Sequence, residues 1–182
     1  MKHNKPTRQV SMRMFLTLVL IMMSSAFVMA QENYGFKVAG VDVTGDNYLD
    51  LTEISGVSGK VYFDPNTRTL TLDNATIEAN DCNAILNETC DYLLIELIGT
   101  NTINVTNSAG IYTRESTVIL GDGGAKLSVK SDLCALLFGG CPLEINNCWL
   151  EAEGKWGISA SYNEAEEELT IRNSHVEATG TS

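Results

Sequence analysis

Aliphatic residues recur along the chain with a period close to 25 residues. The positions that mark this period lie 25, 23, 25 and 26 residues apart, and each follows another aliphatic residue two positions earlier: Leu72, Leu97, Leu120, Ile145 and Ile171. Apolar and polar residues alternate around these positions, which is the pattern of short β-strands. A strand-forming repeat of this length is typical of one coil of a solenoid, in which each coil packs only against its neighbours.

Each repeat contains two strand segments joined by a short turn, in the ranges 70–79, 95–105, 118–129, 143–152 and 169–178. A third segment follows, with apolar residues at the matching positions Ile85, Ile111, Leu136 and Ile158. Three short strands per coil predict an all-β fold, the parallel β-helix solenoid.

Alternate residues of a strand face opposite sides of the sheet, so the apolar positions of successive coils form inward stacks. The residues that mark the period form the first stack. We predict a second stack of Ile77, Ile103, Leu127, Leu150 and Val176. We predict a third stack of Ala79, Val105, Val129, Ala152 and Ala178.

Asparagine recurs in the turn between the first two strands of the coils. Asn74, Asn147 and Asn173 occupy matching positions there. Asparagine tolerates the left-handed backbone conformation, and stacked amides form hydrogen bonds between neighbouring strands. The sequence therefore predicts a structural asparagine ladder at this corner.

Residues 1–30 have the pattern of a secretory signal peptide. Basic residues, among them Lys2 and Arg13, precede the apolar run 14–23, and Val28-Met29-Ala30 offers a small-residue cleavage site. The run is too short for a membrane span, and no run of roughly 18 apolar residues follows, so we expect no transmembrane segment after cleavage. We expect export to the periplasm, the outer surface or the extracellular space.

Residues 31–182 are strongly acidic. The chain has 12 Lys and Arg residues and 23 Asp and Glu residues; because four basic and no acidic residues lie in 1–30, the remainder carries a net charge of −15. Nucleic acid is excluded as a partner, because binding it requires a basic stripe that neutralises phosphates. Neutral sugars, cations and basic partners are compatible with this charge.

Residues 31–69 are expected to cap the first coil. The range 34–44 alternates weakly as a strand, and the ranges 60–63 and 69–72 form a predicted hairpin around Asp64-Pro65-Asn66-Thr67. Residues 70–182 form the coils. The last coil stops at Ser182 with no covering element, so we expect that further chain continues it or that a partner covers its end.

Three segments carry a resemblance to a known family: Gly40-Val41-Asp42-Val43-Thr44, the range 56–65 and the range 70–77. The chain resembles exported bacterial proteins with a right-handed parallel β-helix of the pectate-lyase-like type, often labelled carbohydrate-binding-domain-containing. This resemblance implies a right-handed β-helix and sugar-related work at a surface or in the periplasm. It brings no catalytic motif with it.

Two predicted columns of outward side chains run across the coils. The first contains Thr76, Thr102, Lys126, Trp149 and His175, and the second contains Glu78, Asn104, Ser128, Glu151 and Glu177. Neighbouring coils lie ~4.8 Å apart, so Trp149, Glu151, His175 and Glu177 should converge on one patch.

This patch is a candidate carbohydrate-binding site. Trp149 offers an apolar ring face for a sugar, and the carboxylates can accept hydroxyl hydrogen bonds. Glu151 and Glu177 also have the arrangement of a glycosidase carboxylate pair. A solvated strand face without a ligand accounts for the same residues.

The loop after residue 41 resembles a calcium-binding loop in its spacing of oxygen ligands. Its candidate ligands are Asp42, Thr44, Asp46, Asp50 and Glu53. Asn47 stands where such loops have the glycine of the sharp turn, and a strand precedes the loop in place of a helix. Calcium is therefore a candidate cofactor, and a loop that merely connects cap strands is the alternative.

Five cysteines are present in an exported chain: Cys82, Cys90, Cys134, Cys141 and Cys148. We expect most of them to be small buried apolar residues, with a disulfide between Cys134 and Cys141 as the alternative.

Three functions fit these observations. The first is a non-catalytic exported module that binds glycans or a surface protein through its outer face. The second is part of a carbohydrate-active enzyme, a glycosidase or a polysaccharide lyase. The third is a purely structural surface stalk.

Overall fold

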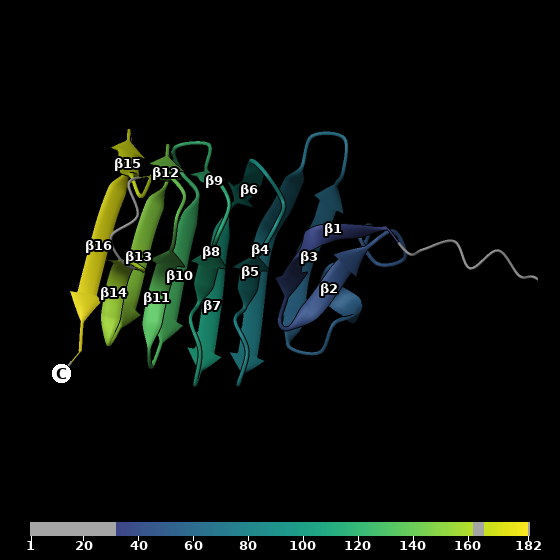
Figure 1. Cartoon of the computed structure of the whole chain (residues 1–182), viewed down its shortest axis with the longest axis horizontal. Coiled ribbons are helices and arrows are strands. Elements are labelled where there is room, and N and C mark those ends of the chain that lie inside the picture. The colour runs from purple at the N-terminus through teal and green to yellow at the C-terminus, as the bar shows by residue number, and fades with distance from the viewer. Residues whose placement is uncertain (1–31, 162–165, 182) are drawn as a thin grey trace, which may run out of the picture. The chain divides into compact units, whose positions relative to one another are not determined.

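The protein is an all-β solenoid of about four turns. The structure is a computed structural model and describes residues 32–161 and 166–181. The predicted signal peptide, residues 1–30, lies outside the described residues. The strands lie side by side along the solenoid axis, as Figure 1 shows. The prediction of parallel coils from the sequence is confirmed.

The first two strands of every coil belong to a ten-stranded sheet that bends between them. The first strands are the amino-terminal half of β4 (Thr69–Asn80), then β6 (Leu93–Ile98), β9 (Thr117–Leu120), β12 (Leu143–Asn146) and β15 (Leu169–Arg172). The second strands are the other half of β4, then β7 (Thr100–Thr106), β10 (Lys126–Ser131), β13 (Trp149–Gly154) and β16 (His175–Gly180). All of these coil strands pair in parallel.

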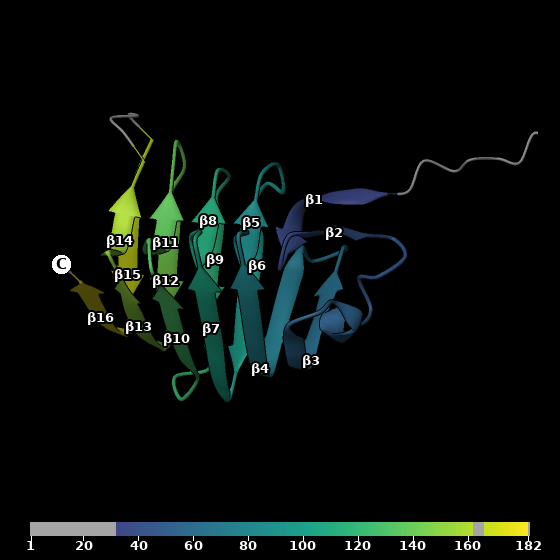
Figure 2. The same cartoon turned by 90° about the horizontal axis from the view of Figure 1, so that it is seen from below.

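The third strands of the coils form a six-stranded sheet together with two cap strands. They are β5 (Ile85–Asn87), β8 (Ile111–Thr113), β11 (Cys134–Phe138) and β14 (Trp156–Ala160), and Figure 2 shows them in one row. Their register pairs Ile85 with Ile111, Ile111 with Leu136 and Leu136 with Ile158. The predicted apolar stack of the third segment is therefore confirmed.

Antiparallel strands lie against the first coil. β1 (Asn33–Val38) pairs with β2 (Val41–Thr44) and with β5, and β3 (Val57–Asp64) pairs with β4, which confirms the predicted hairpin. A short 3-10 helix, η1 (Leu51–Glu53), lies between β2 and β3. Phe36 and Phe63 are buried with their ring centroids 4.8 Å apart, so aromatic packing fills the interior at this end.

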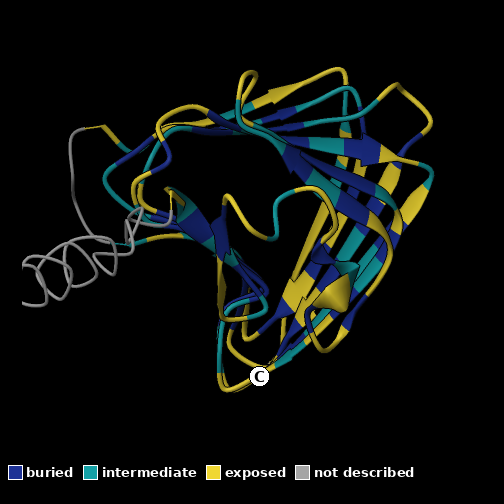
Figure 3. Ribbon diagram, turned by 90° about the vertical axis from the view of Figure 1, so that its right-hand side faces the viewer, coloured by how far each residue is buried: buried dark blue, intermediate teal, exposed yellow. Residues whose placement is uncertain are grey.

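The interior holds stacked aliphatic side chains, and buried residues, dark blue in Figure 3, occur along the strands of both sheets. The first predicted stack is wrong in its first three coils. The register stacks Leu70, Ile95, Ile119, Ile145 and Ile171. Leu72 and Leu97 pair with each other and lie two residues beyond this stack on their strands. Leu120, the predicted member, pairs with Glu96 and Asn146. Because a strand changes face at every residue, a shift of one position moves Leu120 out of the stack.

The other two predicted stacks are wrong by two residues between the second and third coils. Leu127 pairs with Asn101 and Val129 pairs with Ile103, so Lys126 lies beside Thr100 and not beside Thr102. The cause is the turn, because Gly99 alone separates β6 from β7 whereas residues 121–125 separate β9 from β10. Asn101 is consequently buried where the following coils have leucine.

Left-handed residues form the corner between the first two strands in every coil. The asparagines have positive φ angles of 48° at Asn74, 55° at Asn147 and 49° at Asn173, and Gly99 and Gly123 take the same corner with 67° and 90°. Asn74 Oδ1 accepts a hydrogen bond from the Thr100 amide at 3.2 Å. Asn147 donates from Nδ2 to the Gly121 carbonyl at 3.2 Å. The predicted left-handed asparagine corner is confirmed, with glycine at the other two coils. The ladder that the structure shows runs from these amides to backbone groups of neighbouring coils, and not from one asparagine amide to the next.

Replacing Gly99 with alanine is expected to destabilise the fold by about 1–3 kcal/mol. Its backbone is left-handed, and an added Cβ would collide with the Asn74 carboxamide. Denaturant unfolding of the variant measures the change. Gly124→Ala is the matched control, because its φ is not in the left-handed region and its nearest neighbour atom would lie 3.7 Å from the new Cβ. An equal effect of both variants would contradict the ladder as the cause.

All five cysteines are free, and four of them are buried. The prediction of buried apolar cysteines is confirmed for Cys90, Cys134, Cys141 and Cys148, whereas Cys82 is half-buried. The alternative disulfide between Cys134 and Cys141 is not formed: the Cys134 thiol donates to the Leu136 carbonyl and the Cys141 thiol to the Thr113 carbonyl.

The apolar side of the last described strands is open. Leu169 and Ile171 are 38% and 47% exposed, whereas Leu143 and Ile145, at the same positions one coil earlier, are buried. The expectation that further chain or a partner covers this end stays a prediction.

Candidate functional site

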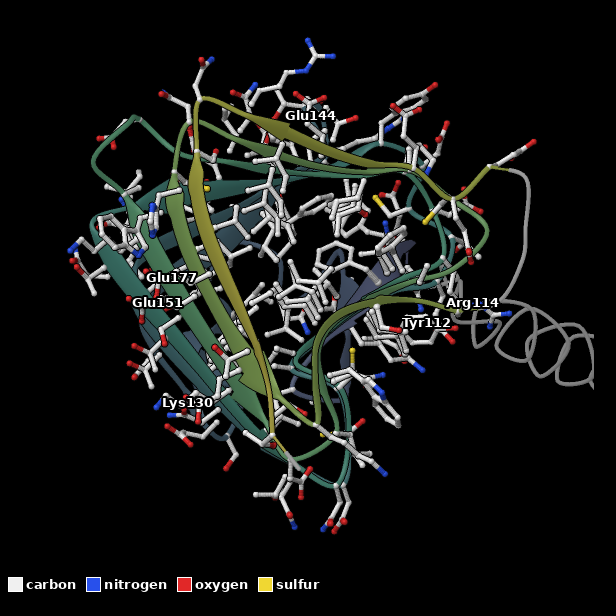
Figure 4. All side chains as sticks on the ribbon, turned by 90° about the vertical axis from the view of Figure 1, so that its left-hand side faces the viewer. Tyr112, Arg114, Lys130, Glu144, Glu151 and Glu177 are labelled. Carbon is white, nitrogen blue, oxygen red and sulfur yellow. The ribbon has the colours of Figure 1, made fainter. Side chains whose placement is uncertain are left out.

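The structure brings the four residues of the predicted patch together on the outer face of β13 and β16. Trp149 pairs in register with His175, and Glu151 pairs with Glu177. His175 Nε2 and Glu177 Oε1 are 2.9 Å apart, which makes a hydrogen bond between neighbouring outward positions of β16. Glu151 and Glu177 lie on the same side of the solenoid in Figure 4.

The ring of Trp149 is covered on both faces, which the sequence did not reveal. Lys126, one coil earlier, places Nζ over the ring at 5.1 Å from its centroid. The imidazole of His175, one coil later, lies 4.1 Å from the ring centroid. Because these neighbours come from opposite sides, Trp149 presents an edge to solvent, and the residue is 39% exposed. A sugar ring stacked on Trp149 would have to displace one of them.

The candidate calcium ligands do not gather into one group. Asp42 Oδ1 lies 3.9 Å from Lys37 Nζ, and Asp50 caps η1 by accepting hydrogen bonds from the amide and the hydroxyl of Thr52. These hydrogen bonds lower the pKa of Asp50, and the bond from the Thr52 hydroxyl has the larger effect.

The rest of the loop is held by its own hydrogen bonds. Asn47 closes the turn by accepting from the Thr44 amide and donating to the Asp42 carbonyl, and the Asp46 amide donates to Thr44 Oγ1. Glu53 lies in η1. Within residues 32–161 and 166–181, no three His, Cys, Asp or Glu side chains are placed to hold a metal ion together.

A hollow on another surface has the composition of a ligand site. It lies over the outer side of β8, β11 and β14 and has a volume of about 650 Å³. Its apolar lining consists of Ala109, Tyr112, Leu133, Cys134, Leu137, Trp156 and Ala160. Its polar lining consists of Asn83, Asn107, Ser108, Ser159 and Ser161. We call it the neutral depression, because none of these residues carries a charge at neutral pH.

The third strands place the side chains of the neutral depression. The register pairs Tyr112 with Leu137 and Leu137 with Ser159, so these residues form one outward column next to the inward stack of Ile111. Figure 4 shows Tyr112 on the opposite side of the solenoid from Glu151 and Glu177. The neutral depression and the predicted patch are therefore separate surfaces.

Trp156 is the most open tryptophan of the described residues. It is 52% exposed, and its neighbour on the preceding coil is the small side chain of Cys134. Lys155 places Nζ over its ring at 4.8 Å from the centroid. Among the described residues, β14 is the last strand of its sheet, and Trp156 is more exposed than Trp149.

Hydrogen bonds order the polar wall of the neutral depression. Asn83 Oδ1 accepts from the Ser108 hydroxyl at 2.6 Å and from the Ala109 amide at 3.0 Å. Asn107 Nδ2 donates to Asp81 Oδ1 at 3.0 Å, and its amide donates to Asp132 Oδ1 at 2.7 Å. These bonds fix the side chains on the turns between the second and third strands, so the wall is prepared before a ligand arrives.

A second hollow differs from the neutral depression because charged side chains line it. It has a volume of about 500 Å³ and lies over the ends of β4, β7, β10 and β13, with Glu78, Lys130, Asp132 and Glu153 in its lining. Lys130 and Glu153 are paired at 3.0 Å, and Asn104 donates to Glu78 at 2.7 Å. Its charged groups are thus satisfied within the protein.

The sequence contained a signal for the neutral depression that the inward stacks concealed. Leu86, Tyr112 and Leu137 each follow a residue of the inward stack of the third strands, so these strands are apolar on both sides. A solvated outer face would carry polar residues at such positions. Trp156 is two residues before Ile158, so alternation alone would place it on the inward face, and the pattern did not reveal its 52% exposure.

No family model matches this sequence, and neither do curated proteins or solved structures at a significant level. Among the described residues, no helix has the length and apolar character needed to span a membrane. Of the resemblance noted in the sequence, the structure supports the fold, a parallel β-solenoid.

Proposed function

We propose that the protein is a non-catalytic binding module that holds a glycan in the neutral depression. The observation that carries the proposal is the combination of an open tryptophan, Trp156, and a tyrosine, Tyr112, with neutral hydrogen-bonding side chains in one concave surface. Sugar rings have apolar C–H faces and polar edges. Aromatic rings contact such faces, while amides and hydroxyls bond the edges.

The lining supports binding without catalysis. Hydrolysis or elimination of a glycan requires a general acid or base, normally a carboxylate, histidine, lysine or arginine at the reacting bond. None of these side chains lines the neutral depression. Cys134, which does line it, has its pKa raised to about 11 by burial, so its thiol stays protonated at neutral pH.

The wider context agrees with this proposal. The predicted signal peptide would export the chain, and the sequence resembles exported β-helix proteins labelled as carbohydrate-binding. We therefore propose that the module works outside the inner membrane, in the periplasm, on the outer surface or in the extracellular space. We also propose that the coils form a right-handed β-helix of the pectate-lyase-like type, as the resemblance implies.

The test compares two tryptophans on opposite surfaces. A glycan array probed with the full chain is expected to show binding that falls at least tenfold in Trp156→Ala, because an aromatic anchor in a binding site contributes about 1–2 kcal/mol or more. Trp149→Ala is the matched control and should bind like the wild type.

The same array distinguishes the alternatives. Binding that is lost in Trp149→Ala and kept in Trp156→Ala would move the site to the patch of Trp149, Glu151, His175 and Glu177. Absence of binding by the wild type would reject the glycan proposal.

A further inference from the structure

We infer that the neutral depression selects uncharged glycans of at least two sugar units and discriminates against uronate and sulfated chains. This inference rests on the proposal that the depression is the glycan site. It concerns the chemical class of the ligand, which follows from the charges around the depression and from the spacing of its two aromatic residues.

The first argument is the absence of a cation. An anionic sugar that enters a concave surface loses water around its charge and needs a positive partner, usually arginine or lysine. No side chain of the lining supplies one. The residues after the predicted cleavage site also carry a net charge of −15, so the field of the whole protein repels anions.

The second argument is the position of the carboxylates behind the polar lining. Asp81 accepts from Asn107, and Glu167 Oε1 accepts from the Ser161 hydroxyl at 3.4 Å and from the Gly140 amide at 3.2 Å. These acids stand behind neutral side chains and do not line the depression. They orient the amide and the hydroxyl, and they oppose the entry of a further negative charge.

Lys155 is the cation that needs separate consideration. It does not line the depression, and its ammonium group lies over the Trp156 ring at 4.8 Å from the centroid. This cation–π contact occupies one face of the Trp156 ring. Lys155 is therefore assigned to holding Trp156, and its removal should not change the preference for uncharged ligands.

The third argument concerns length. Tyr112 lies on β8 and Trp156 on β14, with β11 between them in the sheet. Two steps of ~4.8 Å separate the strands by about 9.6 Å along the solenoid axis. A single pyranose ring is too short to contact both aromatic residues. Leu137, on the intervening strand, continues the apolar floor between them.

Calorimetry with defined oligosaccharides tests the inference on the full chain. The uncharged panel contains the tetraoses of cellulose, xylan, mannan, maltose and chitin, and the anionic panel contains tetragalacturonate and a heparin tetrasaccharide. We expect at least one uncharged tetraose to bind tenfold or more tightly than any anionic one, and at least tenfold more tightly than its own monosaccharide. Lys155→Ala should keep both ratios.

A charge placed in the lining provides the converse test. Ser159→Lys is expected to reduce the preference for uncharged over anionic tetraoses at least fivefold, while Ser159→Ala, the matched control for the lost hydroxyl, keeps the preference. Ser159 is half-buried on the outward side of edge strand β14, so the long side chain has room to reach solvent.

The outcomes separate the inference from the proposed function. Anionic tetraoses that bind as tightly as uncharged ones, in a manner that Trp156→Ala abolishes, would overturn the charge selectivity and leave the glycan site in place. A monosaccharide that binds as tightly as its tetraose would overturn the length requirement. Failure of every sugar to bind in a Trp156-dependent manner would overturn both the inference and the proposed function.

Discussion

Replacing Asn101 with leucine is expected to lower the free energy of unfolding by about 3–4 kcal/mol, although leucine occupies the same position in the next two coils. Asn101 is buried and connects three coils. Its Oδ1 accepts from the Ala75 amide at 2.8 Å, and its Nδ2 donates to the carbonyls of Ile98 and Lys126 at 3.2 and 3.3 Å. Leucine would leave these backbone groups without partners inside the solenoid, where each unsatisfied group costs free energy.

Denaturant unfolding followed by circular dichroism measures this effect. Asn104→Leu is the matched control, because Asn104 lies on the same strand, β7, and its half-buried outward side chain donates one hydrogen bond to Glu78. That control should lose less than about 1 kcal/mol. A loss below about 1 kcal/mol for Asn101→Leu would show that the backbone groups find other partners.

Raising the pH from 8 to 11 is expected to destabilise the protein through its buried thiols. Burial raises the pKa of Cys134 from 9.0 to about 11, and burial also raises the pKa of Cys90, Cys141 and Cys148. Between pH 9 and 11 the unfolded chain releases the Cys134 proton while the folded chain keeps it. Stability is therefore fully present below about pH 8 and falls as the pH rises, by up to roughly 3 kcal/mol for Cys134 alone.

Urea unfolding at pH 8 and at pH 10.5 measures the fall, and Cys134→Ala isolates its cause. The variant lacks the thiol that resists ionisation, so its stability should fall less between the two pH values than that of the wild type. Subtracting the fall in unfolding free energy of the variant from that of the wild type removes the contributions of tyrosines, lysines and the other cysteines, which both proteins share. Equal falls in both proteins would contradict the assignment to Cys134.

Some features of the fold could be predicted from the sequence, and others could not. The period of about 25 residues, the third-strand stack of Ile85 and the asparagine corner were all predictable, because they depend on local alternation and on the backbone preference of one residue type. The register between coils was not predictable. The turn between β6 and β7 has one residue, Gly99, whereas the turn between β9 and β10 has five, 121–125, and this difference in turn length changes which residues become neighbours.

The patch shows the same division on the outer surface. Residues two positions apart on a strand share a face, so the sequence could place Trp149 with Glu151 and His175 with Glu177. It could not show that Lys126 and His175 cover the Trp149 ring, because that contact depends on side-chain rotamers between three coils. For this reason the proposed sugar platform is Trp156.

The repeat pattern is enough to establish the solenoid, because a strand-length repeat with alternating apolar residues can bury its core only by stacking coils. The neutral depression emerges only from the folded chain, since it combines Tyr112, Leu137 and Trp156 from three coils with polar turn residues such as Asn107. Burial follows from a periodic pattern along one strand. A binding surface follows from which side chains meet across strands, and turn lengths set that register.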